Sequence, residues 1–140
     1  LNHLSINSLF YYANYSGKPR VLEPGVYGLS NHFLDTPWPK VRRGVESLRQ
    51  LLARKADPEP DDLLALLTDR AIAPDDELPK TGIPLEWERW LSPLFITAPG
   101  YGTRASSVLR ADSVGNALLV EVTWPSASRR EVRADWPASF

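Results

Sequence analysis

Hydrophobic residues at helical spacing mark the middle of the chain. Four aliphatic residues recur at intervals of four, three and four positions, with Arg and Glu side chains on the opposite side, which predicts an amphipathic helix. Thr36 is expected to cap this helix with its hydroxyl, and Pro37 has a backbone angle suited to a first turn, a role that Pro39 can share. The break at 57–60 precedes a run of leucines and predicts a second helix. The apolar face of the first helix consists of Val41, Val45, Leu48 and Leu52.

Alternating apolar and polar positions predict strands on both sides of the helix pair. Before the pair, turn residues separate short strands in a hairpin-like opening, and after it three strands form an antiparallel meander. The expected strands are Leu9–Ala13, Arg20–Leu22, Gly25–Leu29, Thr103–Arg110, Leu118–Thr123 and Ser128–Trp136, and a short helix is expected at Leu85–Leu91. The order β, then α, then β predicts an α+β fold built as one domain over residues 1–140.

Composition excludes several classes of function. The chain has 140 residues and a formal net charge of -1, with scattered basic residues, which argues against a general nucleic-acid binder. The longest apolar runs, such as Leu63–Leu67, fall far short of the roughly 20 residues that a membrane span needs. With no Cys and two His, the chain itself holds no thiolate zinc site, redox pair or cysteine nucleophile, and a metal centre is not expected.

The ends of the chain suggest a location and a relation to a longer protein. The sequence begins with Leu1 and contains no Met, which is typical of a fragment or a processed piece. It has no recognisable signal segment, and a cytoplasmic location is therefore expected.

The densest cluster of unusual residues runs from Gly28 to Lys40, between a predicted strand end and a helix start. Such positions aim polar groups into clefts, and the Asn31 amide has the chemistry to stabilise a developing oxyanion. The alternative is that Asn31 and Asp35 satisfy the backbone of a turn. His32 is interpreted as an ordinary, partly buried side chain, because no acid at a suitable spacing would orient it as a base.

A second cluster runs from Tyr101 to Ser107 and centres on Arg104. An arginine that points into a cleft can hold a carboxylate or stabilise an anionic nucleophile, because its donors are fixed and its charge is permanent. A surface ion pair is an equally good interpretation. Trp38 is expected to pack at the core or its edge, although an aromatic wall around a flat ligand would use the same side chain.

At these two clusters the chain resembles the NRDE protein family, also known as the Transport and Golgi organisation protein 2 family. The motifs that carry the resemblance keep their order over nearly the whole chain. They are Pro24–Asn31, Leu34–Val41, Asp76–Pro79 with Gly82–Pro84, Ser92–Ile96 and Tyr101–Ser107. The resemblance implies an N-terminal-nucleophile-hydrolase-like fold, in which two antiparallel sheets are sandwiched between helical layers.

The resemblance also identifies what the chain lacks. Members begin with Met-Cys and carry an Asn-Arg-Asp-Glu motif soon after, and neither occurs here, so that the chain resembles the C-terminal portion of such a protein. In related cysteine-nucleophile amidases an asparagine helps form the oxyanion site and a later arginine supports the nucleophile. By position in the motifs, Asn31 resembles the former and Arg104 the latter.

Two functions of the full-length protein are implied by the resemblance. The first is hydrolysis of C–N bonds in small molecules, and the second is haem trafficking without catalysis. For haem, which would be a bound ligand and not a resident cofactor, the candidate ligand-binding residues are Tyr27, His32 and Trp38. A non-catalytic remnant is the third alternative. The expected partners are a small-molecule substrate or haem, together with a second copy of the chain or the missing N-terminal half.

Overall fold

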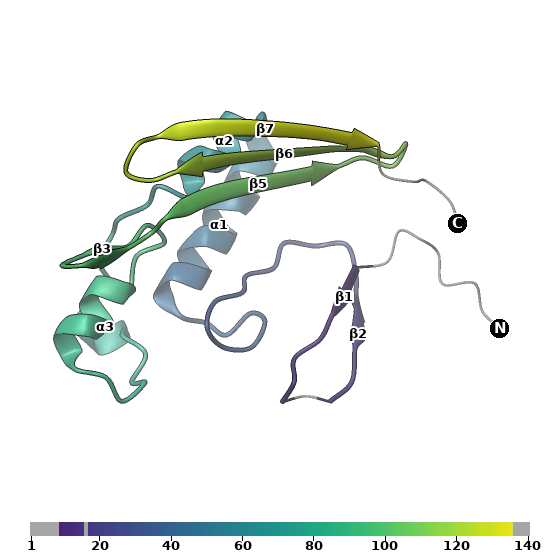
Figure 1. The fold of residues 1–140 in the computed structure, drawn as a ribbon. Coiled ribbons are helices and arrows are strands. Elements are labelled where there is room, and N and C mark those ends of the chain that lie inside the picture. Colours follow the sequence, from purple (N-terminus) through teal and green to yellow (C-terminus); the bar gives the residue numbers. More distant parts are fainter. Residues whose placement is uncertain (1–8, 16, 136–140) are drawn as a thin grey trace.

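The computed structural model describes residues 9–15 and 17–135, in which helices and antiparallel strands are mixed (Figure 1). Within these residues the strands form one three-stranded sheet and two hairpins of two strands each. The sheet consists of β5 (Ala105–Ala111), β6 (Asn116–Thr123) and β7 (Ser128–Asp135), and the hairpins pair β1 (Leu9–Tyr11) with β2 (Arg20–Leu22) and β3 (Thr97–Ala98) with β4 (Tyr101–Gly102). The predicted α+β class is confirmed.

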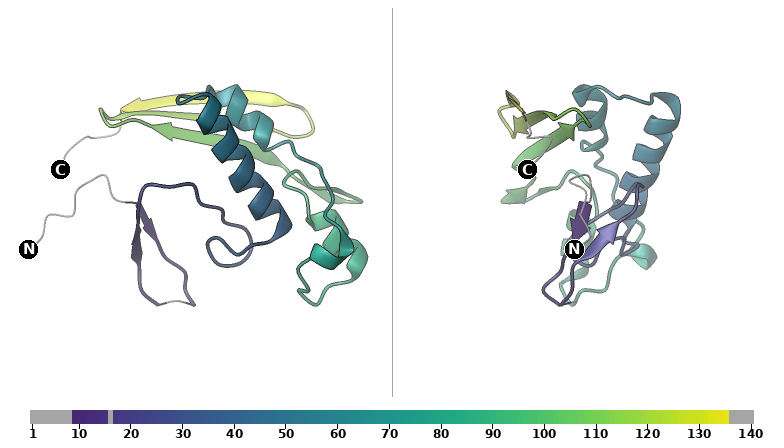
Figure 2. Two further views of the ribbon diagram at one scale, coloured as in Figure 1. Left: turned by 180° about the vertical axis from the view of Figure 1, so that it is seen from behind. Right: turned by 90° about the vertical axis from the view of Figure 1, so that its right-hand side faces the viewer.

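The helices lie to one side of the sheet. They are α1 (Pro39–Arg54), α2 (Pro60–Leu66), α3 (Leu85–Leu91) and the 3₁₀ turn η1 (Asp75–Glu77). Figure 2 shows α1 and α2 on the same face of the β5–β7 sheet, and Figure 1 shows α3 beside β3. The helices expected from apolar spacing are therefore confirmed. In the described part of the chain, no helix has the length and apolar character needed to cross a membrane.

Helix α1 begins without a side-chain cap. Its N-cap residue is Trp38, and Pro39 occupies the first turn, where a missing N–H breaks no helical hydrogen bond. The expected cap by Thr36 is wrong, because this residue lies two positions before the N-cap and its hydroxyl is hydrogen-bonded to His32 Nδ1 at 2.8 Å. The dipeptide Trp38–Pro39 thus sets where the helix starts.

The core lies between α2 and the inner face of the sheet. Leu64 of α2 packs with Val108 of β5 and with Val120 of β6, and Val120 is fully buried. The antiparallel register places Val108 opposite Val120, so that both side chains project to the helix side. On the other face, the same register aligns three exposed aliphatic side chains across the strands, namely Leu109, Leu119 and Val132.

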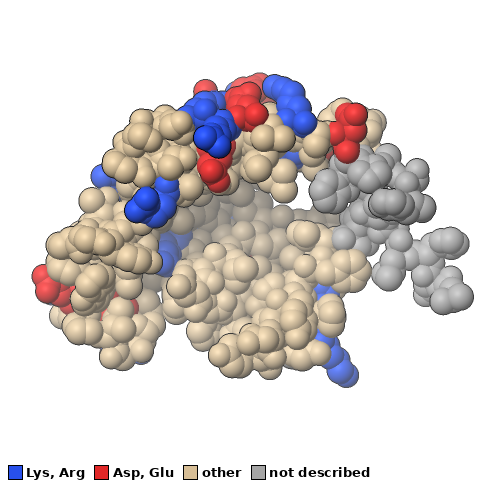
Figure 3. Space-filling view, viewed as in Figure 1, with Lys and Arg blue, Asp and Glu red and all other residues tan. Residues whose placement is uncertain are grey.

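Charged side chains are unevenly distributed over the surface. In the view of Figure 3 they gather mainly over the upper part of the molecule, where the sheet and α2 lie, and a hollow below them is bordered largely by uncharged residues. Arg110 of β5 forms an ion pair with Asp57, and Arg129 of β7 forms one with Asp61, so that charged groups tie the sheet to the start of α2.

Apart from shifts of one or two residues at strand ends, two segments differ from the strand predictions. Gly25–Leu29 is irregular and has no ladder partner among the described residues, because Gly28 exchanges hydrogen bonds with Asp35 in place of a neighbouring strand. The β3–β4 hairpin was not predicted, since each of its strands is only two residues long. Trp136, the expected end of the last strand, lies outside the described residues.

Candidate functional site

The loop between β2 and α1 carries Asn31 and His32, and a pair of hydrogen bonds closes it. The Gly28 N–H donates to Asp35 Oδ1 at 2.8 Å, and the Asp35 N–H donates to the Gly28 carbonyl at 2.7 Å. Asp35 has a positive φ of 59°, which aspartate tolerates because its short side chain bonds to nearby backbone. The interpretation of Asp35 as a turn residue is confirmed, and the loop has a defined shape.

The closed loop is held at two further points. Gly28 lies so close to α1 that a Cβ atom there would come within 2.6 Å of Val41 and 2.9 Å of Val45, so that glycine is needed for the approach. Near the other end of the loop, the Leu34 N–H donates to the Tyr11 hydroxyl of β1 at 3.2 Å. Asn31 therefore projects from a backbone that is fixed on both sides.

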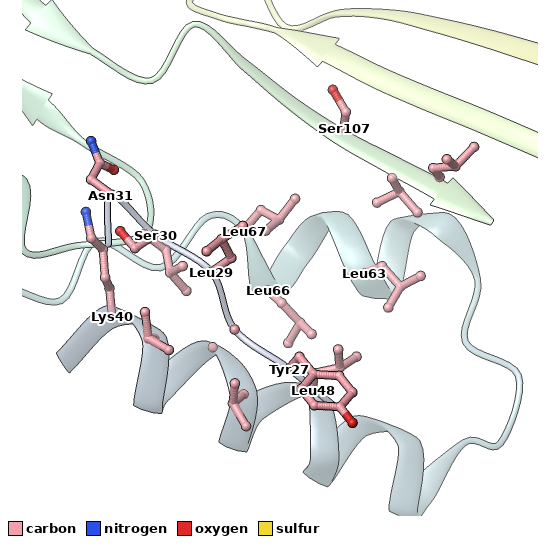
Figure 4. Close-up of a pocket in the computed structure, with 17 residues that line it drawn as sticks. Tyr27, Leu29, Ser30, Asn31, Lys40, Leu48, Leu63, Leu66, Leu67 and Ser107 are labelled. Carbon is pink, nitrogen blue, oxygen red and sulfur yellow. The ribbon is translucent and has the colours of Figure 1, made fainter. Parts of the chain in front are cut away.

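A cavity of about 530 Å³ lies between this loop, α1, α2 and β5, and we call it the apolar cavity (Figure 4). Figure 4 shows Asn31 and Lys40 at one end of it, projecting from the loop and from the first turn of α1. Asn31 is exposed, and its side chain forms no hydrogen bond with any described residue, so that its amide can donate to a ligand. Most of the wall is aliphatic, with side chains such as Val45, Leu48, Leu63, Leu66, Leu67 and Leu94.

Lys40 and Asn31 also line a second cavity of about 290 Å³, between α1, α3 and the β3–β4 hairpin. We call it the aromatic cavity, because Trp38 and Tyr101 form part of its wall. Lys40 Nζ donates to the Leu91 carbonyl at 3.0 Å and lies 6.0 Å from the centre of the Trp38 ring. Burial lowers the pKa of Lys40, because the protein interior solvates an ammonium ion less well than water does.

Sequence reasoning did not single out Lys40 as a site residue, although one signal was present. A cation in the first turn of a helix opposes the positive end of the helix dipole, and α1 has no acidic residue in that turn to compensate. Such a placement is unfavourable for the helix alone and therefore points to a partner elsewhere for the Lys40 ammonium. This partner, the carbonyl of Leu91, is 51 residues away in the sequence.

Arg104 and Asn31 line different cavities. Arg104 lines a cavity of about 750 Å³ together with Arg70 and Trp124, and it is not part of the lining of the apolar or the aromatic cavity. The Arg104 carbonyl accepts a hydrogen bond from the Trp124 N–H at 2.8 Å. Its guanidinium forms no ion pair with residues 9–15 or 17–135. The alternative interpretation of Arg104 as a member of a surface ion pair is therefore not supported by the described residues.

The three candidate haem-binding residues line three different cavities. Tyr27 lines the apolar cavity, Trp38 lines the aromatic cavity, and His32 lines a third one beside the β1–β2 hairpin. His32 and Trp38 are still neighbours, with ring centroids 5.7 Å apart. The expected partial burial of His32 is wrong: the residue is exposed, because the closed loop holds its ring at the surface between Phe33 and Trp38.

Comparison with known proteins decides the family. Residues 1–126 match the family described as Transport and Golgi organisation 2. The chain belongs to this family. It is 32% identical over 120 residues to the Transport and Golgi organization protein 2 homolog of Homo sapiens, and 34% identical over 121 residues to that of Bos taurus. Each alignment covers 79% of this chain and 43% of the relative.

The chain thus spans less than half the length of these Transport and Golgi organisation 2 relatives. The family match includes Asn31, Lys40 and Arg104. Among the described residues, no group of three or more His, Asp or Glu side chains is placed to hold a metal ion.

Titration of individual lysines is expected to separate Lys40 from Lys55. Burial lowers the pKa of Lys40, whereas a hydrogen bond to Asp62 raises the pKa of the exposed Lys55. In the ¹³C-dimethylated protein, the Lys40 signal should therefore lose its proton at lower pH than the Lys55 signal, as followed by NMR. Lys40→Arg and Lys55→Arg variants assign the two signals. A Lys40 midpoint equal to or above that of Lys55 would contradict the half-buried position of the ammonium group.

Proposed function

We propose that the full-length Transport and Golgi organisation 2 protein containing this chain hydrolyses C–N bonds of small molecules. This chain would supply a substrate cavity and one oxyanion donor. The observation that carries the proposal is the side-chain amide of Asn31, which is unbonded among the described residues and lies at the polar end of the apolar cavity. A neutral donor on a loop whose backbone is held on both sides can stabilise the negative charge that develops on a reacting carbonyl oxygen. The Lys40 ammonium at the same end adds a positive charge.

The proposed reaction divides between this chain and the rest of the protein. A thiolate adds to the amide carbonyl, the C–N bond breaks as the amine leaves with a proton, and water then converts the thioester to a carboxylate and frees the thiol. Because this chain contains no Cys, the thiolate would come from elsewhere in the full-length protein, as the family resemblance implies. Asn31 would donate to the oxyanion, and the aliphatic wall would keep water away from the acyl part.

Arg104 would act on the nucleophile and not on the substrate. It lies outside both cavities that Asn31 and Lys40 share, and its guanidinium is without an ion-pair partner in the described part of the chain. A permanent cation of this kind lowers the pKa of a thiol placed beside it and so raises the thiolate fraction. The unpaired guanidinium supports the role that the resemblance implies for Arg104, and its cavity adjoins the aromatic cavity through the shared Ile96 and Tyr101.

Haem binding is the second candidate, and the geometry of His32 favours it. Its Nδ1 is hydrogen-bonded to the Thr36 hydroxyl at 2.8 Å. In the tautomer in which Nδ1 donates this bond, Nε2 carries the lone pair that binds iron. The aromatic rings of Phe33 and Trp38 lie beside the His32 ring, with centroid distances of 4.7 Å and 5.7 Å, and such side chains can contact a flat macrocycle. Tyr27 lines a different cavity and would not belong to such a site.

Two variants of the full-length protein distinguish these functions. Changing the nucleophilic cysteine to alanine should abolish release of amine from a panel of N-acyl amides, because no thiol of this chain can replace it. The same variant should still bind haem, whereas His32→Ala should lose the saturable change in haem absorbance and keep amide hydrolysis. If the wild-type protein shows neither hydrolysis nor a saturable haem signal, it is a non-catalytic remnant and both proposals fail.

A further inference from the structure

The aromatic cavity contains two opposite charges that do not pair with each other. Lys40 of α1 and Glu88 of α3 both line it, and Glu88 is only 6% exposed. Within the described residues no ion pair joins them. Lys40 bonds to the Leu91 carbonyl, and Glu88 bonds to Thr81. Charges removed from water are normally paired, because their desolvation is costly.

Each of the two charged groups has bonding capacity left for a ligand. The Lys40 ammonium has three donors, and one of them is used among the described residues, on Leu91. Glu88 Oε1 accepts the Thr81 N–H at 2.8 Å and the Thr81 hydroxyl at 2.6 Å. Glu88 Oε2 has no hydrogen-bond partner among the described residues. Because every buried side-chain oxygen of these residues has a partner, Oε2 is not buried and must be accessible to solvent or a ligand. The space that Glu88 lines is the aromatic cavity.

The remaining wall of the aromatic cavity is flat or aliphatic. Trp38 and Tyr101 contribute aromatic side chains, and Ile83 and Ile96 contribute branched aliphatic ones. At about 290 Å³ the cavity lies at the small end of the range for ligand sites in proteins. Its occupant is therefore small and carries an apolar group next to its charges.

We propose that the aromatic cavity binds a small zwitterion of the amino-acid class, with its carboxylate at Lys40, its ammonium at Glu88 and an apolar side chain against Trp38 and Tyr101. A molecule with one charge would leave either Lys40 or Glu88 without a partner. The proposal goes beyond C–N hydrolysis, because binding at this cavity requires neither a nucleophile nor an oxyanion donor.

A series of three probes tests the charge requirement on the unmodified full-length protein. L-phenylalanine carries both charges, 3-phenylpropanoate lacks the ammonium group, and 2-phenylethylamine lacks the carboxylate. Isothermal titration calorimetry should show each single-charge probe binding about 10- to 100-fold more weakly than L-phenylalanine, because a bond to a charged group is lost. If either single-charge probe binds as tightly as L-phenylalanine, the proposal is overturned.

Substitutions then assign the two charges to their residues. Lys40→Met keeps an unbranched apolar chain and removes the proposed carboxylate partner. In this variant L-phenylalanine should bind no more tightly than 2-phenylethylamine. Glu88→Gln keeps an oxygen acceptor for Thr81 and removes the proposed ammonium partner. In this variant L-phenylalanine should bind no more tightly than 3-phenylpropanoate. Lys80→Met and Glu86→Gln are matched controls at exposed positions outside the cavity lining, and their affinities should stay within about 2-fold of wild type.

The outcomes are separable from the test of hydrolysis. Absence of saturable L-phenylalanine binding, or binding that both Lys40→Met and Glu88→Gln leave unchanged, overturns the zwitterion site. Neither result affects amine release from N-acyl amides. Conversely, an inactive full-length protein that binds L-phenylalanine with the expected charge selectivity retains the site and loses the hydrolase function.

Discussion

Replacing Asn31 with alanine in the full-length protein is expected to lower kcat for amide hydrolysis by about 100- to 1,000-fold, with little change in KM. The side-chain amide would donate to an oxygen whose negative charge is fully developed only near the transition state. Its loss therefore weakens binding of the transition state much more than binding of the substrate. Steady-state kinetics with one N-acyl amide substrate, measured for the wild-type and variant proteins, check both parameters.

The fold should not be affected by this substitution. Asn31 is exposed and makes no side-chain hydrogen bond to a described residue, so that the free energy of unfolding should change by no more than about 0.5 kcal/mol. Gln50→Ala is the matched control, because it truncates an amide on α1 that donates to Glu46 at 2.7 Å and lines neither the apolar nor the aromatic cavity. Equal losses of kcat in the two variants, or a loss confined to KM, would remove Asn31 from the oxyanion site.

The elements that the sequence predicts well are those whose signal is local. Helix α1 (Pro39–Arg54) repeats one apolar face over several turns, so that spacing alone predicts the helix, although it begins two residues later than the expected start at Pro37. The turn between β5 and β6 is equally local, because Asp112 Oδ1 accepts the N–H groups of Val114 and Asn116 within five residues. Neither element depends on a distant part of the chain.

The elements and site features that were missed depend on distant contacts. The β3–β4 hairpin has two residues in each strand, too few for a period of two to be visible. The importance of Lys40 appears only when α3 brings the Leu91 carbonyl to its ammonium group. Similarly, the sequence motifs predicted that Asn31 and Arg104 belong to one site. The packing of loops and hairpins shows that they line separate cavities.

A substitution at Gly28 tests whether the loop between β2 and α1, which carries Asn31, packs tightly against α1. Gly28→Ala is expected to lower the free energy of unfolding by about 1–3 kcal/mol, because the added methyl group overpacks a tight contact. A Cβ atom would come within 2.6 Å of Val41 Cγ1 and 2.9 Å of Val45 Cγ2. Both valines are branched at Cβ and stiff in a helix, so that they can move little. Gly28 is not among the glycines with positive φ, and alanine is therefore acceptable to its backbone.

Gly44→Ala is the matched control, since it makes the same change on the helix that faces the loop. A Cβ atom at Gly44 would lie 3.5 Å from Leu94, an ordinary contact, and alanine inside a helix is favoured over glycine by about 0.5–1 kcal/mol. Urea unfolding of the three proteins should therefore rank Gly44→Ala as most stable and Gly28→Ala as least stable. If Gly28→Ala matched the wild type, the loop would not rest on Val41 and Val45. The fixed position of Asn31, on which the oxyanion role depends, would then lose its structural basis.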